Sequence, residues 1–347
     1  MNLLALDIGG AYIKSSLIKF NNSNAKILIN KRNAFNFRVN SNNLDDALSE
    51  ELQNHVDKNT IIDMVIITIT AETIGIFNTI KDGVIKIAKI CEETFFEFKI
   101  YYISTDGNIH NYNQLKNRPM DFASANWVAT SKLAAKYIED GLFIDMGTTT
   151  TDIIPIKNKI ICPTAKTDMA RLVSGELLYM GLLRTYISNI VDKLPFNDTF
   201  IPLASEIRCF TAHIYVALGM IKELEMLHPF SGKKIKITRT NSLDAIARSV
   251  CADKTLIECD KIVKMANYVY KKQMRKIIDN CNRIINRNWL YNTKLKILVT
   301  GHGAKLIKNA LHSEKIGEII DDMAVFENSE NATAIALSML LAEKYNN

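Results

Sequence analysis

The stretch GLFIDMGTTTTDIIPI, residues 141–156, places four consecutive threonines between two apolar runs. Residues 142–144 are typical of a short buried strand, Gly147 permits a tight turn, and residues 153–156 supply a returning strand. The pattern predicts a hairpin with Asp145 at the end of its first strand. A carboxylate beside glycine and threonine amides and hydroxyls can hold a phosphate together with its metal ion. Taken alone, the segment also fits an edge hairpin whose β-branched threonines only favour strand geometry.

The N-terminal segment LLALDIGGAYIKSSLIKF, residues 3–20, repeats this arrangement. An apolar run leads to Asp7, then to the pair Gly9 and Gly10, and then to a returning strand from about residue 12 to residue 20. Two such hairpins in one chain can grip a polyphosphate from two sides. We therefore expect Asp7 and Asp145 to hold Mg²⁺ through its water shell.

The composition indicates a globular protein. The chain has 347 residues, 48% of them apolar, which is enough to bury a core in two domains or one large one. The first residues lack the pattern of a secretory signal, and no apolar run approaches the ~18 residues of a membrane span. We expect a cytoplasmic protein with no membrane contact. The six cysteines include no CxxC pair and the six histidines are scattered, so the sequence indicates neither a disulfide framework nor a zinc site.

Residues 261–287 form a basic segment in a chain whose net charge is only +6. Apolar residues recur in it at near-helical intervals, which predicts a long amphipathic helix. Its basic side could attract nucleic acid or another anion. Tyr268 and Tyr270 are its only aromatic residues, too few for stacking on bases. We therefore favour a solvated helix face and expect no nucleic-acid partner.

The rest of the chain adds strands and slender helices to the two hairpins. Apolar segments at residues 63–70 and 100–103 indicate further strands, so the N-terminal half is predicted to be α/β with a mixed sheet. Alanine-rich residues 121–138 and 332–345 predict helices slim enough for close packing, and residues 168–289 look mainly helical. A strand at 296–300 runs into Gly301 and Gly303, which let a ligand approach the backbone and the following helix.

These parts, in this order, resemble the five-part signature of the actin, hexokinase and heat-shock-chaperone superfamily across nearly the whole chain. The resemblance implies two ribonuclease-H-like (actin-like ATPase) domains with mixed sheets and a largely helical insertion, residues 168–289, in the second. We expect the domains at residues 1–138 and 139–330, with a C-terminal helix at 331–347 packed back on the first. The phosphate-binding residues that we expect are Gly9, Gly10, Lys14, Gly147, Thr148, Thr149, Thr150, Gly301 and Gly303.

Shorter motifs narrow the resemblance. The segments TAETIGIFNTIKDGV, GLFIDMGTTTTDIIPI and TDMARLVSGELLYMGLLRT, which begin at residues 70, 141 and 167, are similar to hydantoinase/oxoprolinase-like proteins associated with tetrahydromethanopterin-linked one-carbon transfer. Within that branch they resemble synthases of methanofuran biosynthesis. The resemblance implies a transferase that couples an aminomethylfuran diphosphate to the phenol of γ-glutamyltyramine and releases diphosphate.

This chemistry suggests roles for several charged residues. A furfuryl-type diphosphate ionises with positive charge shared by the furan ring, so the enzyme mainly stabilises the departing diphosphate. The incoming phenol, with an ordinary pKa near ~10, needs a carboxylate or a cationic environment. Asp168, Arg171, Glu176 and Arg184 are candidates, although ordinary surface pairing would also explain them. We expect Glu72, which follows a buried strand, and Glu176 as general bases, and Arg184 as a further catalytic residue.

Two other functions stay open at this point. One is an ATP-dependent small-molecule kinase or amide-ring hydrolase of the same superfamily, which would use Asp7 and Asp145 for Mg²⁺ and residues 301–303 beside adenine. The other is a non-catalytic nucleotide-binding protein that resembles actin. The sequence does not choose between diphosphate and ATP, because both need the same loops. It also leaves the oligomeric state open.

Overall fold

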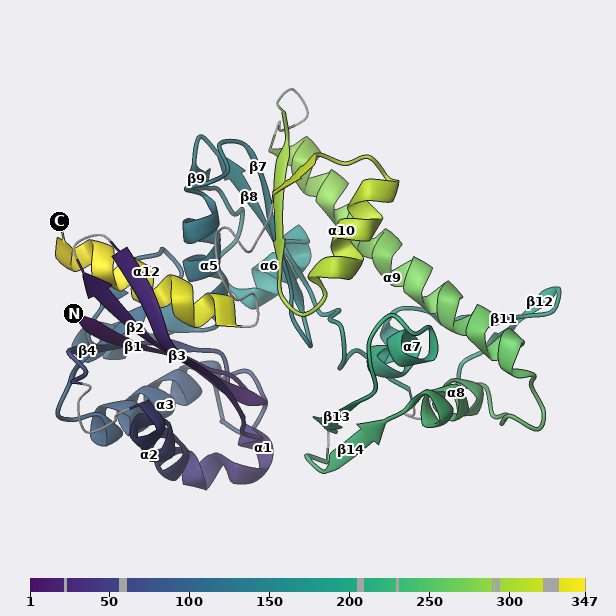
Figure 1. Cartoon of the computed structure of the whole chain (residues 1–347), viewed down its shortest axis with the longest axis horizontal. Helices are drawn as coiled ribbons and strands as arrows, with labels where there is room; N and C mark the ends of the chain where they lie inside the picture. Colours follow the sequence, from purple (N-terminus) through teal and green to yellow (C-terminus); the bar gives the residue numbers. More distant parts are fainter. Residues whose placement is uncertain are drawn as a thin grey trace. The chain divides into compact units, whose positions relative to one another are not determined.

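The computed structural model describes residues 1–21, 24–55, 61–204, 209–228, 231–288, 290, 294–320 and 331–346. The chain divides into two compact units (Figure 1). Unit 1 comprises Met1–Glu139, Ile156–Arg171 and Asp321–Asn347, and unit 2 comprises Asp140–Pro155 and Leu172–Ile320. The domain boundaries expected at residues 138/139 and 330/331 stay predictions. Residues 321–330, next to the second boundary, lie outside the described residues, as do residue 289 of the expected helical insertion and residue 347 of the expected C-terminal helix.

Unit 1 is built on a mixed six-stranded sheet in the order β3-β2-β1-β4-β5-β6. Its strands are β1 (Asn2–Ile8), β2 (Tyr12–Asn21), β3 (Asn24–Ala34), β4 (Met64–Ile69), β5 (Lys99–Ile103) and β6 (Ile109–His110). The central strand β1 pairs antiparallel with β2 and parallel with β4. The apolar runs at residues 3–6 and 64–69 are therefore buried neighbours at the middle of the sheet, as their lack of charge predicts.

Helices cover both faces of this sheet (Figure 1). The C-terminal helix α12 (Ala332–Asn346) packs on β1, β2 and β4, while α2 (Leu44–His55) and α3 (Ile80–Thr94) lie against the opposite face, where their apolar side chains join the core. The unit also contains α1 (Phe37–Asn40), η1 (Ser41–Asn43), α4 (Tyr112–Asn117), η2 (Pro119–Phe122), α5 (Asn126–Ala134) and the short strand β9 (Ile160–Ile161).

The slender helix predicted over residues 121–138 is shorter in the structure. Ser124 has a φ of 49°, in the left-handed region that a regular helix excludes. Ala125 is the N-cap and α5 therefore begins at Asn126. Close packing by small residues holds nonetheless, because α5 packs against α12 and both Ala129 and Ala336 are fully buried.

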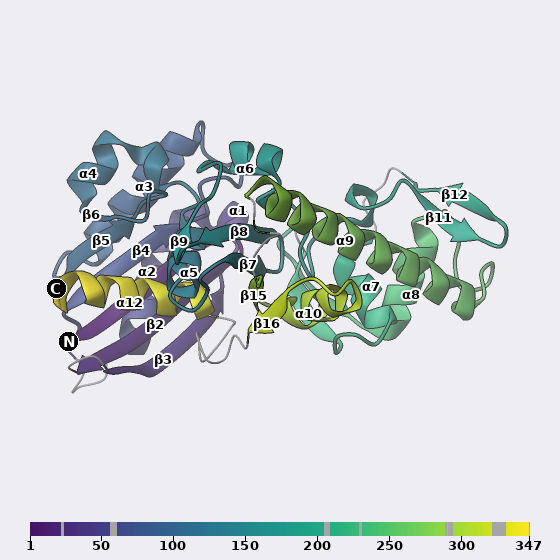
Figure 2. The same ribbon diagram turned by 90° about the horizontal axis from the view of Figure 1, so that it is seen from above.

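Unit 2 contains a second mixed sheet, in the order β10-β8-β7-β15-β16. Its strands are β7 (Gly141–Met146), β8 (Thr151–Lys157), β10 (Leu177–Leu178), β15 (Lys296–Thr300) and β16 (Glu318–Ile320). β15 runs parallel to both β7 and β16, and β10 is antiparallel to β8. Apolar residues of β7 and β15 form a core with α10 (Ala304–Ser313) and with the C-terminal half of α9 (Cys259–Arg287). The basic helix predicted at residues 261–287 is thus confirmed (Figure 2).

Residues 168–288 contain helices and also small hairpins. The helices are α6 (Asp168–Ser174), α7 (Thr211–Ala217), α8 (Arg239–Arg248) and α9, with the short η3 (Ile187–Asn189). Two antiparallel pairs accompany them, β11 (Lys193–Phe196) with β12 (Thr199–Pro202) and β13 (Leu224–Leu227) with β14 (Lys234–Ile237). The mainly helical structure expected over residues 168–289 does not extend to Glu176, because α6 ends at Ser174 and Gly175 follows with a φ of 78°. We find no helix among the described residues with the length and hydropathy that crossing a bilayer requires.

Candidate active site

The threonine turn, residues 147–150, joins β7 to β8 in unit 2. The amide of Gly147 donates to the carbonyl of Thr150 at 2.9 Å, which closes the turn. The carbonyls of Gly147 and Thr148 accept hydrogen bonds from the amides of residues 182–184, each at 3.0 Å. One side of the turn is therefore fixed by the backbone of residues 182–184.

The other side of the turn offers hydrogen-bond donors. In a trans peptide the N–H points opposite to the C=O, so the amides of Thr148 and Thr149 point away from residues 182–184. No described residue accepts a hydrogen bond from either amide. Successive amides that point the same way form a concavity suited to an anion, and the half-buried threonine hydroxyls add further donors. The geometry supports the phosphate loop predicted from the four threonines.

A similar turn, residues 9–12, joins β1 to β2 in unit 1. The amide of Gly9 donates to the carbonyl of Tyr12 at 3.0 Å. The carbonyls of Gly10 and Ala11 accept from the amides of residues 37 and 35, at 3.2 and 3.0 Å. The amide of Ala11 consequently points away from that segment, and no described residue accepts its proton. The two hairpins recognised in the sequence share one construction.

Asp7 lies on β1, two residues before this turn, and is only 4% exposed. Its partner in the antiparallel register is Lys14, whose Nζ lies 3.5 Å from Oδ2 of Asp7. The hydroxyl of Thr70 donates to Oδ1 of Asp7 at 3.5 Å. Burial raises the pKa of Asp7, and the charge of Lys14 opposes that rise. The structure therefore brings together two of the predicted site residues, Asp7 and Lys14.

Asp145 occupies the matching place in unit 2, two residues before the threonine turn. Gly301 follows the parallel strand β15 with a φ of 86°, and a Cβ there would lie 2.2 Å from Oδ1 of Asp145. The amide of Gly303 donates to the carbonyl of Met146 at 2.9 Å. The predicted residues Asp145, Gly301 and Gly303 thus gather at the carboxyl ends of β7 and β15, and only glycine fits at position 301.

Two threonines at these strand ends were missed by the sequence analysis. Thr68 is the register partner of Asp7 on β4, and Thr300 is the register partner of Asp145 on β15. Both hydroxyls are buried and have no hydrogen-bond partner among the described residues. Each is a polar residue that follows a run of apolar residues at or near the end of its strand, a signal that could have identified them. Each unit therefore places a buried threonine beside its aspartate.

Glu72 follows β4 in unit 1 and is 2% exposed. The hydroxyl of Ser124 donates to its Oε1 at 2.8 Å, while its Oε2 has no hydrogen-bond partner among the described residues. Burial raises the pKa of Glu72 to about 7, and the negative charge of Asp168 acts in the same direction, whereas the Ser124 hydrogen bond opposes it. A carboxyl group that titrates near neutrality, with one oxygen unengaged, suits proton transfer.

The other candidates occupy different surroundings. In unit 1 the guanidinium of Arg171 stacks 4.2 Å above the ring of Trp127 and lies 3.8 Å from Asp168. In unit 2 the fully buried Glu176 accepts a hydrogen bond from Nη2 of Arg287 at 2.5 Å, so its carboxylate is engaged in an ion pair. The geometry therefore favours Glu72 over Glu176 as a base.

Arg184 belongs to the segment under the threonine turn, since its amide donates to the carbonyl of Thr148. Its side chain carries positive charge close to His228. Burial lowers the pKa of His228, and the charge of Arg184 lowers it further. Arg184 thus adds positive charge in the part of unit 2 that holds the turn.

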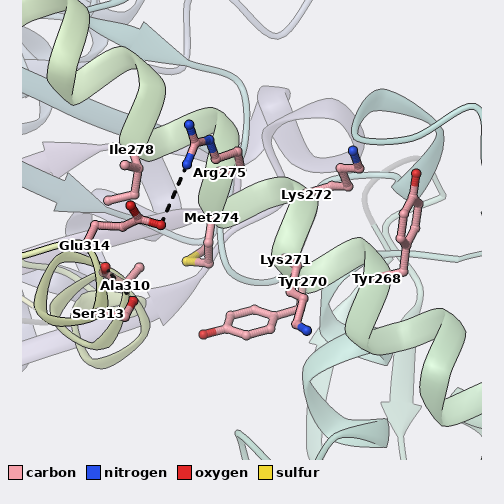
Figure 3. A pocket seen from close by; sticks show the side chains of 10 residues that line it. All are labelled: Tyr268, Tyr270, Lys271, Lys272, Met274, Arg275, Ile278, Ala310, Ser313 and Glu314. Carbon is pink, nitrogen blue, oxygen red and sulfur yellow. Dashed lines mark hydrogen bonds and ion pairs between the residues drawn. The ribbon is translucent and has the colours of Figure 1, made fainter.

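A groove of about 550 Å³ lies between α9 and α10 in unit 2 (Figure 3). Arg275 on its rim binds Asp279 at 2.9 Å and Glu314 at 3.7 Å. The lining residues are Tyr268, Tyr270, Lys271, Lys272, Met274, Arg275, Ile278, Ala310, Ser313 and Glu314. None of the site residues predicted from the sequence belongs to this set. The groove is therefore distinct from the threonine turn.

The side chains near the turns also fit the expected metal. Mg²⁺ takes oxygen ligands, and proteins usually bind it through one or two carboxylates together with substrate phosphates and water. Among the described residues we find no group of three or more His, Cys, Asp or Glu that could hold a metal by themselves. In each unit an aspartate, Asp7 or Asp145, lies beside a buried threonine hydroxyl, and such a carboxylate can bind Mg²⁺ that the ligand's own oxygens also coordinate.

The two sheets, the glycine turns at their strand ends and the packing of α12 define a protein with the actin-like ATPase fold, made of ribonuclease-H-like domains. The solved structure of nucleotide-free acetone carboxylase shares this fold. It aligns over 97% of this chain and 70% of its own, with a TM-score of 0.57 and 9% identity. At that identity the likeness concerns the fold alone.

Sequence comparison identifies the family. The hydantoinase/oxoprolinase family matches residues 63–344, and this chain belongs to it. The chain is 32% identical over 318 residues to the (4-{4-[2-(γ-L-glutamylamino)ethyl]phenoxymethyl}furan-2-yl)methanamine synthase of Methanocaldococcus jannaschii, which covers 90% of both chains. A synthase of the same name from Methanococcus vannielii is 35% identical over 170 residues, covering 49% of this chain and 74% of its own. The family resemblance seen in the sequence motifs is confirmed.

Proposed function

We propose that this chain is a transferase that makes the aryl ether for which these two relatives are named. The observation that carries the proposal is the 32% identity over 90% of both chains. The name of that product contains a phenoxymethyl link, in which a phenol oxygen is bonded to the methylene carbon of a furan. The substrates are an aminomethylfuran diphosphate and γ-glutamyltyramine, and we expect the enzyme to work in the cytoplasm.

The reaction exchanges one carbon–oxygen bond for another. The bond between the furan methylene carbon and diphosphate breaks, and its electron pair leaves with the diphosphate. The phenol oxygen then bonds to the methylene carbon, and the phenol proton passes to a base. Because charge builds up on the departing diphosphate, donors fixed in advance lower the barrier. The amides of Thr148 and Thr149 and the nearby threonine hydroxyls supply such donors.

Two kinds of carboxylate have separate roles in this proposal. Asp7 and Asp145 would hold Mg²⁺, which would neutralise charge on the diphosphate. Glu72 accepts the phenol proton, because its pKa of about 7 is closer to that of a phenol than the pKa of an ordinary carboxyl group. Arg184 and Lys14 add positive charge near the threonine turn and near Asp7, respectively.

The identity of the bound anion, diphosphate or ATP, distinguishes the proposed function from an ATP-dependent one. We expect inorganic diphosphate with Mg²⁺ to bind more tightly than a non-hydrolysable ATP analogue in calorimetry, because adenine gains no specific contact in a site shaped for a furan diphosphate. The coupled ether should appear in the mass spectrum when both substrates are present. Tight binding and turnover of ATP without the coupled product would refute the proposal in favour of a kinase or hydrolase.

A further inference from the structure

Gln273 is a fully buried polar residue on the inward face of α9. The residues one helical turn away on that face, Val269 and Ile277, are apolar and also fully buried. A buried amide destabilises the fold unless its hydrogen bonds are satisfied. Here Nε2 of Gln273 donates to the carbonyl of Gly181 at 3.0 Å, and Oε1 accepts from the hydroxyl of Tyr215 at 2.8 Å. Both ends of the amide are therefore engaged.

Gly181 is held from more than one side. Its carbonyl also accepts from the hydroxyl of Thr211 at 3.2 Å, and its amide donates to the hydroxyl of Thr185 at 2.8 Å. The ring of Tyr215, which orients the Gln273 amide, packs edge-on against Tyr270 with ring centroids 6.1 Å apart. The position of Gly181 is therefore set by the buried side chain of Thr185 and by buried side chains from α7 and α9.

Gly181 rests directly on the threonine turn. A Cβ on this residue would lie 2.5 Å from the carbonyl carbon of Thr148 and 2.5 Å from the nitrogen of Thr149. The next residues, 182–184, bind the carbonyls of the same turn. Because the peptide between Thr148 and Thr149 lies against Gly181 and its carbonyl is bound by residues 183 and 184, a shift of Gly181 tilts that peptide and redirects its N–H group.

We propose that Gln273 is a positioning residue for diphosphate. Through Gly181 it holds the peptide between Thr148 and Thr149 so that the Thr149 amide points at the anion, although Gln273 does not touch the ligand. This inference rests on the proposed function, since it takes the threonine turn as the diphosphate site. It explains why an amide, rather than another apolar side chain, is buried at this place in α9.

The test compares Mg²⁺-diphosphate binding by calorimetry in the full chain and three variants. Gln273→Met combined with Tyr215→Phe removes both polar partners together, so no buried group is orphaned and Thr211 still binds the Gly181 carbonyl. We expect diphosphate to bind about tenfold more weakly, the effect of one misdirected hydrogen bond to a charged ligand. Cys281→Ala, a fully buried change on the same helix, is the control and should keep the wild-type affinity.

Gln273→Glu adds a readout that a merely structural role would not affect. A protonated glutamic acid can still donate to the Gly181 carbonyl, whereas an ionised one repels it. Relative to the wild type, diphosphate affinity of this variant should recover as the pH falls. Wild-type affinity in the double variant, or no added pH dependence in Gln273→Glu, would overturn the inference. Wild-type protein that does not bind diphosphate would instead overturn the proposed function, and with it the basis for the inference.

Discussion

The ionised side chain of Glu72 destabilises the folded protein, and we propose that the same side chain acts as the base. Its pKa is raised from the ordinary value of 4.5 to about 7, chiefly by burial. Between these values the unfolded chain loses the proton while the folded chain keeps it, so stability falls as the pH rises. A residue that destabilises the fold in its ionised state and has an unengaged oxygen is typical of a functional site.

Glu72→Gln should therefore change activity and stability in opposite directions. Turnover should drop by roughly 10²–10⁴-fold, the usual worth of a general base. At pH 8 the variant should be more stable than the wild type by roughly 1–3 kcal/mol, and the difference should vanish below about pH 4.5. The rise of wild-type turnover through about pH 7 should be absent in the variant. Denaturant titrations and steady-state kinetics across this pH range would measure both effects, and undiminished turnover would exclude Glu72 as the base.

Asp7→Asn and Asp145→Asn should each lower turnover by ~10²–10³-fold, because each removes a charge that stabilises the metal and the departing anion. Asp63→Asn is a matched control. Asp63 accepts a hydrogen bond from the amide of Asn2 at 2.6 Å, at the opposite end of β1 from Asp7. Turnover should be measured across a range of Mg²⁺ concentrations, with circular dichroism to check the fold. Near-normal activity of either variant at ordinary Mg²⁺ would remove its residue from the metal site.

At the scale of elements, the sequence predicts those strands and turns that depend on a local residue pattern. The alternation of apolar runs and glycine turns located both hairpins, because strand, carboxylate and turn lie within a few residues of each other. The pairing of Thr68 with Asp7 was not predictable, since register between distant strands follows from the whole sheet. Nor was the ion pair of Glu176 with Arg287, whose partners lie far apart in the sequence. The mainly helical structure expected over residues 168–289 is interrupted before Glu176, because Gly175 adopts a positive φ that the sequence pattern does not reveal.

The close approach of Gly181 to the threonine turn gives a testable prediction for the turn. Gly181→Ala forces the backbone of Thr148 and Thr149 to move, because the added Cβ would lie 2.5 Å from each. Diphosphate affinity should fall by roughly tenfold to a hundredfold as donors are misdirected. Gly219→Ala is the control, since an alanine there strains the backbone, whose φ is 68°, but crowds no neighbouring atom within 4 Å. If both variants bind diphosphate equally well in calorimetry, the turn does not depend on residue 181.

The packing of α12 in unit 1 gives another testable prediction. Ala336 is fully buried, and α12 packs on both α5 and the central sheet. Ala336→Leu overfills this region and should destabilise the protein by about 1–3 kcal/mol. The exposed Glu343, on the same helix, provides the control, because Glu343→Leu adds apolar volume on the surface and loses only an ion pair with Lys136. Denaturant titration should separate the two variants, and equal stability would show that α12 is not closely packed at Ala336.

At the scale of the whole molecule, the two units repeat one design. In each, the second-last residue of a buried strand is an aspartate and a glycine turn follows. The adjacent parallel strand brings a buried threonine into register with the aspartate. The units differ in what surrounds this design, since unit 1 adds Glu72 and Lys14 whereas unit 2 adds the threonine turn and Arg184. We propose that these turns bind the anion, and the family relationship indicates the reaction that uses it.

In the proposed reaction, the enzyme joins the phenol oxygen to the furan methylene carbon. The most direct test supplies γ-glutamyltyramine labelled with ¹⁸O in its phenol group, together with aminomethylfuran diphosphate and Mg²⁺, and analyses both products by mass spectrometry. We predict that the ether retains the whole label and that the released diphosphate contains none, because the bond that breaks joins the furan methylene carbon to a diphosphate oxygen. Label in phosphate or diphosphate, or turnover of ATP with no labelled ether, would contradict this account.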